Sequence, residues 1–545
     1  MSNLPIPGSV VLVDLDGHAN GPHASAHNDI ILHPTPSRDV NDPLNWSKWR
    51  KQLHFAMLMT YTLTAGIAGT AFNSVLLPLS TESGVPVGDL VAGIGYMFLL
   101  LGWGGLITQP LAMTFGKRPI YLISQIGHLG MVCWMPFIHS SGIWFANRII
   151  MGILVSPIEM LVEISIADIF FAHERGFYMG LYVIFLVGGN YIAPVWAGFA
   201  NDSFGYKWVF WISAIQLAAG TVAMALFMEE TNYVRGTTEL QEQHDIGTPT
   251  DDAEKNTDAK GDDILVQTVS AGRALEGTPY TFVQKLALYR QRYTDTRTLY
   301  AQIYRPIIFL RYPVVVWYVP LSPTRLTRPR SGFLYGASVM WYNVLNATAS
   351  LLFTEVYGFK PSGVGLTYLG PTIGATIAGL LSGWLADLWL VRQARRKGGM
   401  REPEDRLWLM AFITVLFPAG LILWGVGAAK QIHWIGLVIG GGIVAATGAS
   451  AATFSINYVL DSYKDLGGEV MLTVMLVRNT MSFAMNYAIT PWLKMGYQNT
   501  FIMAALLGMA LYATFYPVIL IGKRWRKASA KSYWGYVESS IMAGH

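Results

Sequence analysis

Apolar stretches long enough to cross a lipid bilayer alternate with short polar segments along most of the chain. A membrane-spanning helix needs roughly 20 apolar residues to match a hydrocarbon core of about 30 Å. Six stretches precede one long polar segment and six follow it. The pattern therefore predicts an all-α integral membrane protein with twelve transmembrane helices in two six-helix bundles. The helices are expected over residues 53–79, 89–112, 119–138, 143–167, 176–200 and 207–228, and over 333–354, 364–390, 407–428, 433–459, 468–492 and 500–521.

The polar segments divide the chain into five expected parts. These are a cytoplasmic N-terminal tail, a first bundle, a cytoplasmic linker, a second bundle and a cytoplasmic C-terminal tail, at residues 1–50, 51–228, 229–310, 311–521 and 522–545. Within the second bundle, residues 319–332 contain three prolines and three arginines. Such a segment does not fit inside hydrocarbon. We interpret it as an insertion or as a gene-model artefact.

Composition and charge support the membrane interpretation. The chain is 52% apolar and only 13% charged, with a mean hydropathy of +0.37, whereas a soluble surface needs more charge. If both tails are cytoplasmic, the short inner loops hold ten Lys and Arg residues and the outer loops hold four. Because basic residues favour the cytoplasmic side, we expect both termini inside and a plasma-membrane location. The net charge of +4 then reflects topology, and no nucleic-acid partner is expected.

Four segments of the sequence resemble one family of membrane proteins. They are QPLAMTFGKRPIYL (109–122), NRIIMGILVSPIEMLVEISIADIFFAHERG (147–176), LVGGNYIAPVWAGFANDSFGYKWVFWI (186–212) and GWLADLWLVRQARRKGGMREPEDRLW (383–408). Together they resemble the major facilitator superfamily, in particular a fungal branch close to the drug:proton antiporters and to fungal polyamine and cation transporters. The resemblance covers roughly residues 41–525. It implies a secondary transporter that works by alternating access.

The resemblance also implies gating loops in both halves. The family's loop between spans two and three usually reads Gly-Leu-Ala-Asp-Arg-Gly, and here Gln109, Met113 and Thr114 replace its first Gly, its Asp and its Arg. The retained residues are Gly116, Lys117 and Arg118 in this loop and Gly383, Asp387 and Arg392 in the matching loop of the second half. Such residues can pair with helix ends and carboxylates in one conformation and release them in another. Alternatively, these charges only fix the topology.

The fifth span carries Ala193-Pro194 and then Ala197-Gly198, where the family's antiporter motif normally has Gly-Pro and Gly-Gly. Small residues allow close helix contact, and a proline inside a helix can bend it. We interpret Ala193, Pro194 and Gly198 as a tight hinge that limits leak or, alternatively, as ordinary small-residue packing. Just beyond this motif Asn201 begins a glycosylation sequon that faces outside but lies close to the membrane.

The fourth span contains three ionisable side chains, Arg148, Glu159 and Glu163. An ionised group at mid-membrane costs about 2.5–3.5 kcal/mol on insertion scales, so such residues often mark functional sites. At about 100° per residue the three share one helix face, which we expect to line a central cavity. A glutamate there can exchange a proton or bind a cationic substrate, and competition between the two gives antiport. The alternative is a structural Arg–Glu pair between helices.

Further polar residues on other spans complete a cavity lining drawn from both halves. Facilitator-type folds place the substrate near the membrane midplane between the halves, whereas isolated asparagines also hydrogen-bond neighbouring helices. Both interpretations stay open for each residue. The candidates for substrate or proton binding are Asn73, Asn190, Asn343, Asn346, Arg478, Asn479 and Asn486.

The sequence contains no nucleotide-binding Walker pattern, no metal-ligand spacing and no hydrolase elbow. We therefore expect no enzyme activity, no metal and no cofactor, with a proton as coupling ion. The leading hypothesis is a monomeric, proton-coupled exporter of a small organic molecule such as a drug, a secondary metabolite or a polyamine-like cation. The alternatives are proton-coupled uptake of a nutrient or cation, and a membrane sensor that does not transport.

Overall fold

The computed structural model describes residues 10–11, 23–24, 27–31, 39–233, 278, 280–281, 284, 286–288, 296–309, 332–396, 400–463 and 467–542. Residues 311–318 and all but the last residue of the 319–332 segment lie outside this set. Most of the linker predicted over 229–310 and most of the first 38 residues also lie outside it.

The N-terminal half forms six long rods, three of which are interrupted by a turn or a short 3-10 helix. The rods are α1 (Lys48–Thr70) continued by η2 (Ala71–Val75) and α2 (Leu76–Ser83), α3 (Val87–Phe115), α4 (Lys117–Trp134) with η3 (Met135–Phe137), α5 (Ser141–Val155) with α6 (Pro157–Ile169), α7 (Ala172–Phe204) and α8 (Tyr206–Phe227). A further 3-10 helix, η1 (Pro43–Asn45), precedes them.

The C-terminal half repeats this plan with six more rods. They are α12 (Gly332–Glu355), α13 (Pro361–Thr367) with α14 (Leu369–Arg396), η4 (Pro403–Leu409) with α15 (Met410–Ala429), α16 (Trp434–Ser462), α17 (Gly467–Leu493), and α18 (Tyr497–Ala513) with α19 (Phe515–Met542). Two antiparallel strand pairs occur beside the rods, β1 (Val10–Val11) with β4 (Met400–Arg401) and β2 (His23–Ala24) with β3 (His27–Ile31).

Local sequence explains where several of these helices begin and end. Ser47 and Ser140 accept hydrogen bonds from the free N–H groups at the starts of α1 and α5, as N-cap residues do. Pro157 occupies the first position of α6, where its missing N–H costs nothing. Gly84 ends α2 at a φ of +72°, a conformation that favours glycine.

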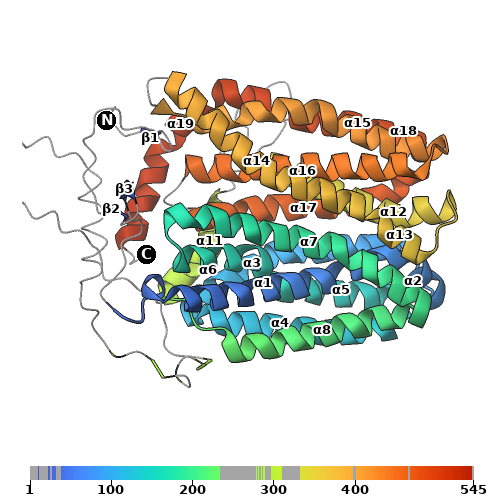
Figure 1. Cartoon of the computed structure of the whole chain (residues 1–545), viewed down its shortest axis with the longest axis horizontal. Coiled ribbons are helices and arrows are strands. Elements are labelled where there is room, and N and C mark those ends of the chain that lie inside the picture. Colours follow the sequence, from blue (N-terminus) through green and yellow to red (C-terminus); the bar gives the residue numbers. More distant parts are fainter. Residues whose placement is uncertain are drawn as a thin grey trace, which may run out of the picture.

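The two halves form two bundles that lie side by side, coloured blue to green and yellow to red in Figure 1. Each bundle has its own apolar core, with Tyr61 and Trp144 buried in the first and Phe417 and Trp424 in the second. Helix α1 begins and α19 ends at one end of the molecule, called here the tail end, on the left of Figure 1. The opposite end, called the far end, carries α2 and α13. This architecture matches the predicted twelve-helix fold.

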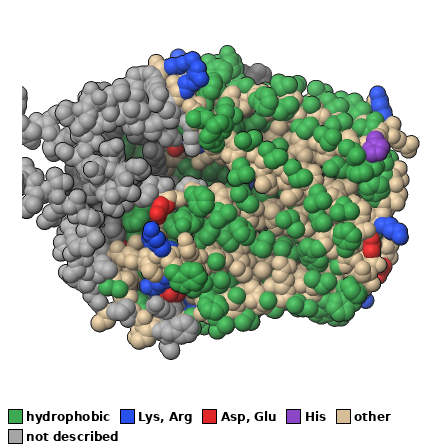
Figure 2. Space-filling view, in the orientation of Figure 1, with side chains coloured by type: hydrophobic (Ala, Val, Ile, Leu, Met, Phe, Trp, Pro, Cys, Tyr) green, Lys and Arg blue, Asp and Glu red, His purple; other side chains and the backbone are tan. Residues whose placement is uncertain are grey.

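The side surface of the rods is apolar, as a bilayer requires. Large side chains such as Leu380, Phe412 and Val415 are more than half exposed, and Figure 2 shows hydrophobic groups over the middle of the molecule with charged groups near its ends. Within the described residues, ten rods are long and apolar enough to cross a membrane, judged by length and composition alone. The two others, α12 and α17, contain Asn343, Asn346, Arg478 and Asn486 and pack against each other. Their polar groups therefore face protein rather than lipid.

One helix was not predicted from the sequence. Residues 296–309 of the expected linker form α11 (Thr296–Phe309), which packs against α3 of the first half and α17 of the second. Arg305 forms an ion pair with Glu469 at 3.2 Å, and Thr473 donates a hydrogen bond to the Pro306 carbonyl at 2.9 Å. The end of the linker is thus attached to both bundles.

Candidate functional site

A buried ion pair joins the two bundles near the middle of their helices. Glu159 on α6 is 7% exposed and Arg478 on α17 is 2% exposed, and an Arg478 guanidinium nitrogen donates to the Glu159 carboxylate. Arg478 also donates to the Tyr335 hydroxyl at 2.7 Å and to Asn479 Oδ1 at 3.0 Å. The pair therefore connects α6 of the first half to α12 and α17 of the second.

A second carboxyl group lies beside this pair. Glu163 follows Glu159 by one turn on the same face of α6, on its tail-end side. Its side chain is partly buried, and Glu159 and Arg478 are its electrostatic neighbours. Within the described part of the chain, its carboxylate takes part in no hydrogen bond or ion pair. The site thus contains two carboxyl groups and one guanidinium group.

Arg148 lies apart from this site, inside the core of the N-terminal bundle. It is fully buried, and its guanidinium group stacks on the rings of Trp144 and Phe72 at 3.9 and 4.4 Å from their centroids. Its N–H groups donate to methionine sulfur atoms at 3.4 to 3.7 Å. Cation–π contacts of a desolvated guanidinium contribute about 2 kcal/mol each, so the core itself supports this charge.

The three ionisable residues of the fourth span do not gather at one place. That span consists of α5 and α6, which meet at Ser156, a residue with helical dihedral angles (φ −50°, ψ −30°), and Pro157 opens the second helix. Glu159 pairs with Arg478 and Glu163 lies beside them, whereas Arg148 is directed into the N-terminal core.

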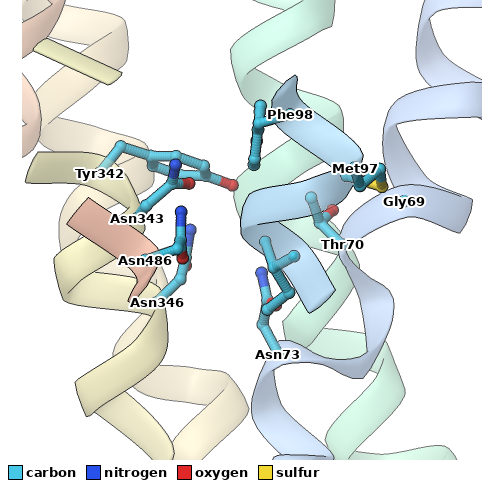
Figure 3. Close-up of a pocket in the computed structure, with 10 residues that line it drawn as sticks. Gly69, Thr70, Asn73, Met97, Phe98, Tyr342, Asn343, Asn346 and Asn486 are labelled. Carbon is cyan, nitrogen blue, oxygen red and sulfur yellow. The ribbon is translucent and has the colours of Figure 1, made fainter. Parts of the chain in front are cut away.

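A narrow cavity, called here the amide chamber, lies between the bundles on the far-end side of the ion pair. It is lined by Gly69, Thr70, Asn73, Ile94, Met97, Phe98, Tyr342, Asn343, Asn346 and Asn486. Figure 3 shows Tyr342, Asn343, Asn346 and Asn486 of the second half facing Thr70 and Asn73 of the first. The structure thus gathers four of the predicted asparagines, from α12, α17 and η2, around one space.

The amide chamber and the ion pair share two helices but occupy different levels. On α12, Asn343 follows Tyr335 by eight residues, and on α17, Asn486 follows Arg478 by eight. At 1.5 Å per residue both intervals correspond to about 12 Å along the helix axis. A solute confined to the amide chamber therefore does not touch the carboxyl groups of α6.

Two other predicted asparagines form helix contacts. Asn190 Oδ1 lies 3.3 Å from the position that a Cβ on Gly66 would occupy, where α7 crosses α1. Asn479 is fully buried, and its Cβ and amide lie against Gly102 of α3. Asn479 lies beside the ion pair, since its Oδ1 accepts from Arg478, and neither residue is part of the lining of the amide chamber.

The bundles contact each other closely at the far end. Gly198 of α7 leaves no room for a Cβ because the Pro361 carbonyl of α13 lies against it, and Gly365 is in the same position relative to the Pro194 carbonyl. Asp202 also accepts a hydrogen bond from the Ser362 N–H at 3.1 Å. Ala193 is buried in the N-terminal core, and α7 stays helical through Pro194. The predicted hinge residues therefore lie where α7 packs on α13.

The loop between α3 and α4 is fastened within its own half. Gly116 has a φ of +110°, which glycine adopts without strain. The Glu230 carboxylate, just after α8, accepts hydrogen bonds from the N–H groups of Lys117 and Arg118, each at 3.0 Å. A negative charge is favourable at this helix N-terminus. Lys117 also pairs with Asp168 at the end of α6.

The acidic partners of this loop come from positions that the family pattern did not indicate. Asp168 and Glu230 supply the negative charge that Met113 lacks, and Arg118 donates to the Ala225 carbonyl at 2.8 Å. The acidic pair Glu229–Glu230 at the end of the sixth span was the available sequence signal. Glu229 binds Arg50 of α1 at 2.5 Å, so the whole cluster fastens the tail end of the first bundle.

The corresponding region of the second half is also charged. Arg526 of α19 is completely buried and binds Glu404 of η4 at 2.6 Å, while Arg406 pairs with Asp461 of α16 at 3.5 Å. The predicted Gly383 and Asp387 lie on α14, where the Asp387 side chain is outside the described set. Arg392 is exposed near the end of α14. Neither Glu404 nor Arg526 was predicted from the sequence as a site residue.

The glycosylation candidate lies in a helix. Asn201 occupies the last turn of α7 at the far end and is partly buried. Its Nδ2 lies 3.5 Å from Asp202 Oδ1.

Two helical bundles with a lipid-facing apolar surface and a polar cavity between them define a multi-pass integral membrane transporter for a small molecule, and not an enzyme. The chain belongs to the Major Facilitator Superfamily, whose sequence pattern matches residues 58–485. This agrees with the resemblance noted from the motifs.

Similar proteins come from fungi. An uncharacterised MFS-type transporter of Schizosaccharomyces pombe is 26% identical and covers 98% of this chain and 94% of its own length. Protein HOL1 of Saccharomyces cerevisiae is 25% identical and covers 92% and 91%, respectively. Among solved structures, the peptide transporter POT has a TM-score of 0.56 at 15% identity, covering 88% of this chain and 96% of that one, which supports the fold alone.

Proposed function

We propose that the chain is a proton-coupled secondary transporter that exports a small organic molecule across the plasma membrane by alternating access. It works as a monomer with both termini in the cytoplasm, needs no cofactor and binds no nucleic acid. Export is the direction favoured by the resemblance to fungal drug:proton antiporters. Uptake by symport would use the same groups in the opposite direction.

The observation that carries the proposal is the inter-bundle pair of Glu159 and Arg478, with the carboxyl group of Glu163 one turn away and without an ion-pair partner among the described residues. Two ionised carboxylates beside one guanidinium would leave a net negative charge inside the membrane, which is costly. One bound proton makes the group neutral. We therefore expect one exchangeable proton at this site.

The same pair couples the proton to movement of the bundles. While Glu159 is ionised, its attraction to Arg478 holds α6 against α17. Because Glu163 lies on the same helix beside Arg478, this attraction is lost only when both carboxyl groups carry a proton, and Arg478 then keeps its hydrogen bond to Tyr335 of its own half. Tyr182, which donates to the Ile158 carbonyl at 3.0 Å, is the other titratable group packed on this part of α6. Protonation thus changes how firmly the halves are joined, as a two-state switch requires.

The test is flux in vesicles that contain the purified full-length protein and a pH-sensitive dye. A panel of neutral, cationic and anionic aromatic solutes is added with and without an imposed pH gradient. For at least one solute, we expect movement against an opposing proton gradient and a matching pH change inside. Glu163→Gln should reduce the pH-dependent part of the solute flux to background. Glu174→Gln, at an exposed site on α7, should retain the wild-type transport rate.

Glu159→Gln should also abolish pH-dependent flux, but it leaves Arg478 without its ionic partner, so its expression and folding are measured in parallel. Wild-type, pH-dependent rates in both glutamine variants would refute the proposed proton site. A transport rate that is the same with and without the pH gradient would refute proton coupling. If none of the solutes is transported, the result would favour the alternative that the protein is a membrane sensor.

A further inference from the structure

We infer that the amide chamber binds an uncharged polar group of the transported molecule, of the carboxamide, urea or lactam type. The inference rests on the proposed function, since it takes the chamber to be where the solute sits. It excludes an ammonium or a carboxylate as the group held there.

The first argument is charge. None of the ten residues that line the amide chamber carries an acidic or basic side chain. The Arg148 guanidinium lies behind the chamber wall, 3.7 Å from Sδ of the lining residue Met97, and the Glu159–Arg478 pair lies about 12 Å away along α12 and α17 with its charges neutralised. An ammonium in the chamber would lose its hydration near this positive charge, and a carboxylate would lose its hydration while Met97 separates it from Arg148, which is unfavourable for both.

The second argument is hydrogen bonding. Asn343 and Asn346 are 3% and 4% exposed, and in the described structure the Nδ2 of the first and the Oδ1 of the second have no hydrogen-bond partner. Three residues apart on α12, they share a face. They present one free donor beside one free acceptor. A carboxamide, urea or lactam satisfies both at once through its carbonyl and its N–H, and an unsatisfied buried pair is otherwise costly.

The third argument is that both bundles contribute. Figure 3 shows Asn73 and Thr70 on the opposite wall from Asn343, Asn346 and Asn486. Thr70 already donates to the Gly66 carbonyl at 2.8 Å, and Asn486 to the Ser482 carbonyl at 2.8 Å, so these groups are fixed in orientation. A neutral group bound here would contact α12 and η2 at the same time, so its binding would depend on how close the two bundles lie.

A second, aromatic cavity adjoins the amide chamber and shares Asn346 with it. Its walls include Tyr191, Tyr368 and Trp424. Ring faces of this kind accept an apolar or aromatic group. The expected substrate therefore combines a neutral hydrogen-bonding head with an aromatic or apolar body. Because both cavities are narrow in this structure, binding requires the bundles to separate slightly.

The experiment compares three probes that share one aromatic body, 2-naphthamide, 2-naphthylmethylammonium and 2-naphthoate. Each is titrated into the purified full-length protein in lipid nanodiscs at pH 7, and binding is followed by naphthalene fluorescence. We expect 2-naphthamide to bind at least about tenfold more tightly than either ion. Tighter binding of the ammonium or the carboxylate, or no binding of the amide, would overturn the inference.

Variants locate the binding site. Asn343→Ala and Asn346→Ala should each weaken 2-naphthamide binding about tenfold, whereas Asn499→Ala, an exposed amide on α18, should leave it unchanged. Asn343→Asp adds a carboxylate to the amide chamber and should shift the preference toward 2-naphthylmethylammonium about tenfold. Wild-type binding in all chamber variants would place the site elsewhere. If a variant does not fold, the relative affinities of the three probes for the wild-type protein still test the inference.

The failure of this inference differs from failure of the proposed function. Proton-coupled flux of ammonium compounds alone would sink the neutral-group assignment and leave proton coupling intact. Conversely, 2-naphthamide could bind in the amide chamber while the transport rate does not change with the pH gradient. That result would support the neutral-group assignment and refute proton coupling.

Discussion

At the scale of single residues, three fully or almost fully buried arginines each have a specific neighbour. Arg478 binds Glu159, Arg526 binds Glu404, and Arg148 stacks on aromatic rings. A buried ion pair contributes little compared with an apolar pair of the same size, but removal of one partner leaves an unpaired charge. Such side chains therefore tolerate paired replacement better than single replacement.

The first prediction concerns the pair between η4 and α19. Glu404→Ala should destabilise the folded protein by about 3–5 kcal/mol, because it leaves Arg526 buried without its counter-ion. Thermal unfolding in detergent measures the change. Lys523→Ala is the control, since Lys523 is 53% exposed in its pair with Glu402 and such surface pairs contribute at most about 1 kcal/mol. Equal losses in the two variants would contradict the argument.

The sequence indicated which residues were unusual but not how they combine. Glu159, Glu163, Arg478 and the chamber asparagines were recognisable because polar groups are costly within apolar spans. Their grouping depends on contacts between helices distant in the chain. For Glu230 the sequence offered only the acidic pair Glu229–Glu230 after the sixth span, and its contact with the N-terminus of α4 depends on the fold.

At the scale of elements, interruptions within helices decide where functional side chains point. Asn73 lies on η2, between α1 and α2, and Glu159 follows the break between α5 and α6. Apolar length predicted the rods well, since it reflects bilayer thickness. Pro157 was the sequence signal for the change from α5 to α6, whereas no proline marks the change from α1 to η2 at Ala71.

The contact between α7 and α13 gives the second prediction. Gly198→Leu should prevent close packing on Pro361 and open the far end, because a side chain cannot fit there. In a Cys133→Ala background, a cysteine at Thr70 should then react at least about tenfold faster with an impermeant maleimide added on the far-end side. Gly180→Leu lies on the same helix with no neighbour near its Cβ position, so it should leave the labelling rate unchanged. An unchanged labelling rate at position 70 in Gly198→Leu would show that the contact between α7 and α13 does not close the far end.

At the scale of the whole molecule, two bundles of six rods surround the least apolar pair, α12 and α17. Burial of polar rods between apolar ones keeps the outer surface compatible with lipid. Figure 1 places the start of α1 and the end of α19 at the tail end. The even number of rods agrees with that placement.

The third prediction is the sidedness of the intact protein. In the Cys133→Ala background, cysteines at Lys360 and Lys430 should be labelled from outside the cell, and cysteines at Arg50 and Lys531 only after permeabilisation. The expected cause is the excess of basic residues in the loops of the tail end. Labelling of Arg50 and Lys531 positions from opposite sides would contradict an even number of crossings.

Helix α11 has a consequence for the route that a solute takes. Its ties to α3 and α17 fix one flank of the molecule, where the two bundles stay in register. On another side of the molecule, α7 of the first bundle contacts α13 and α14 of the second directly. We therefore expect the bundles to separate between α7 and α14 more readily than along α11, and a solute arriving at the tail end should enter between these two helices.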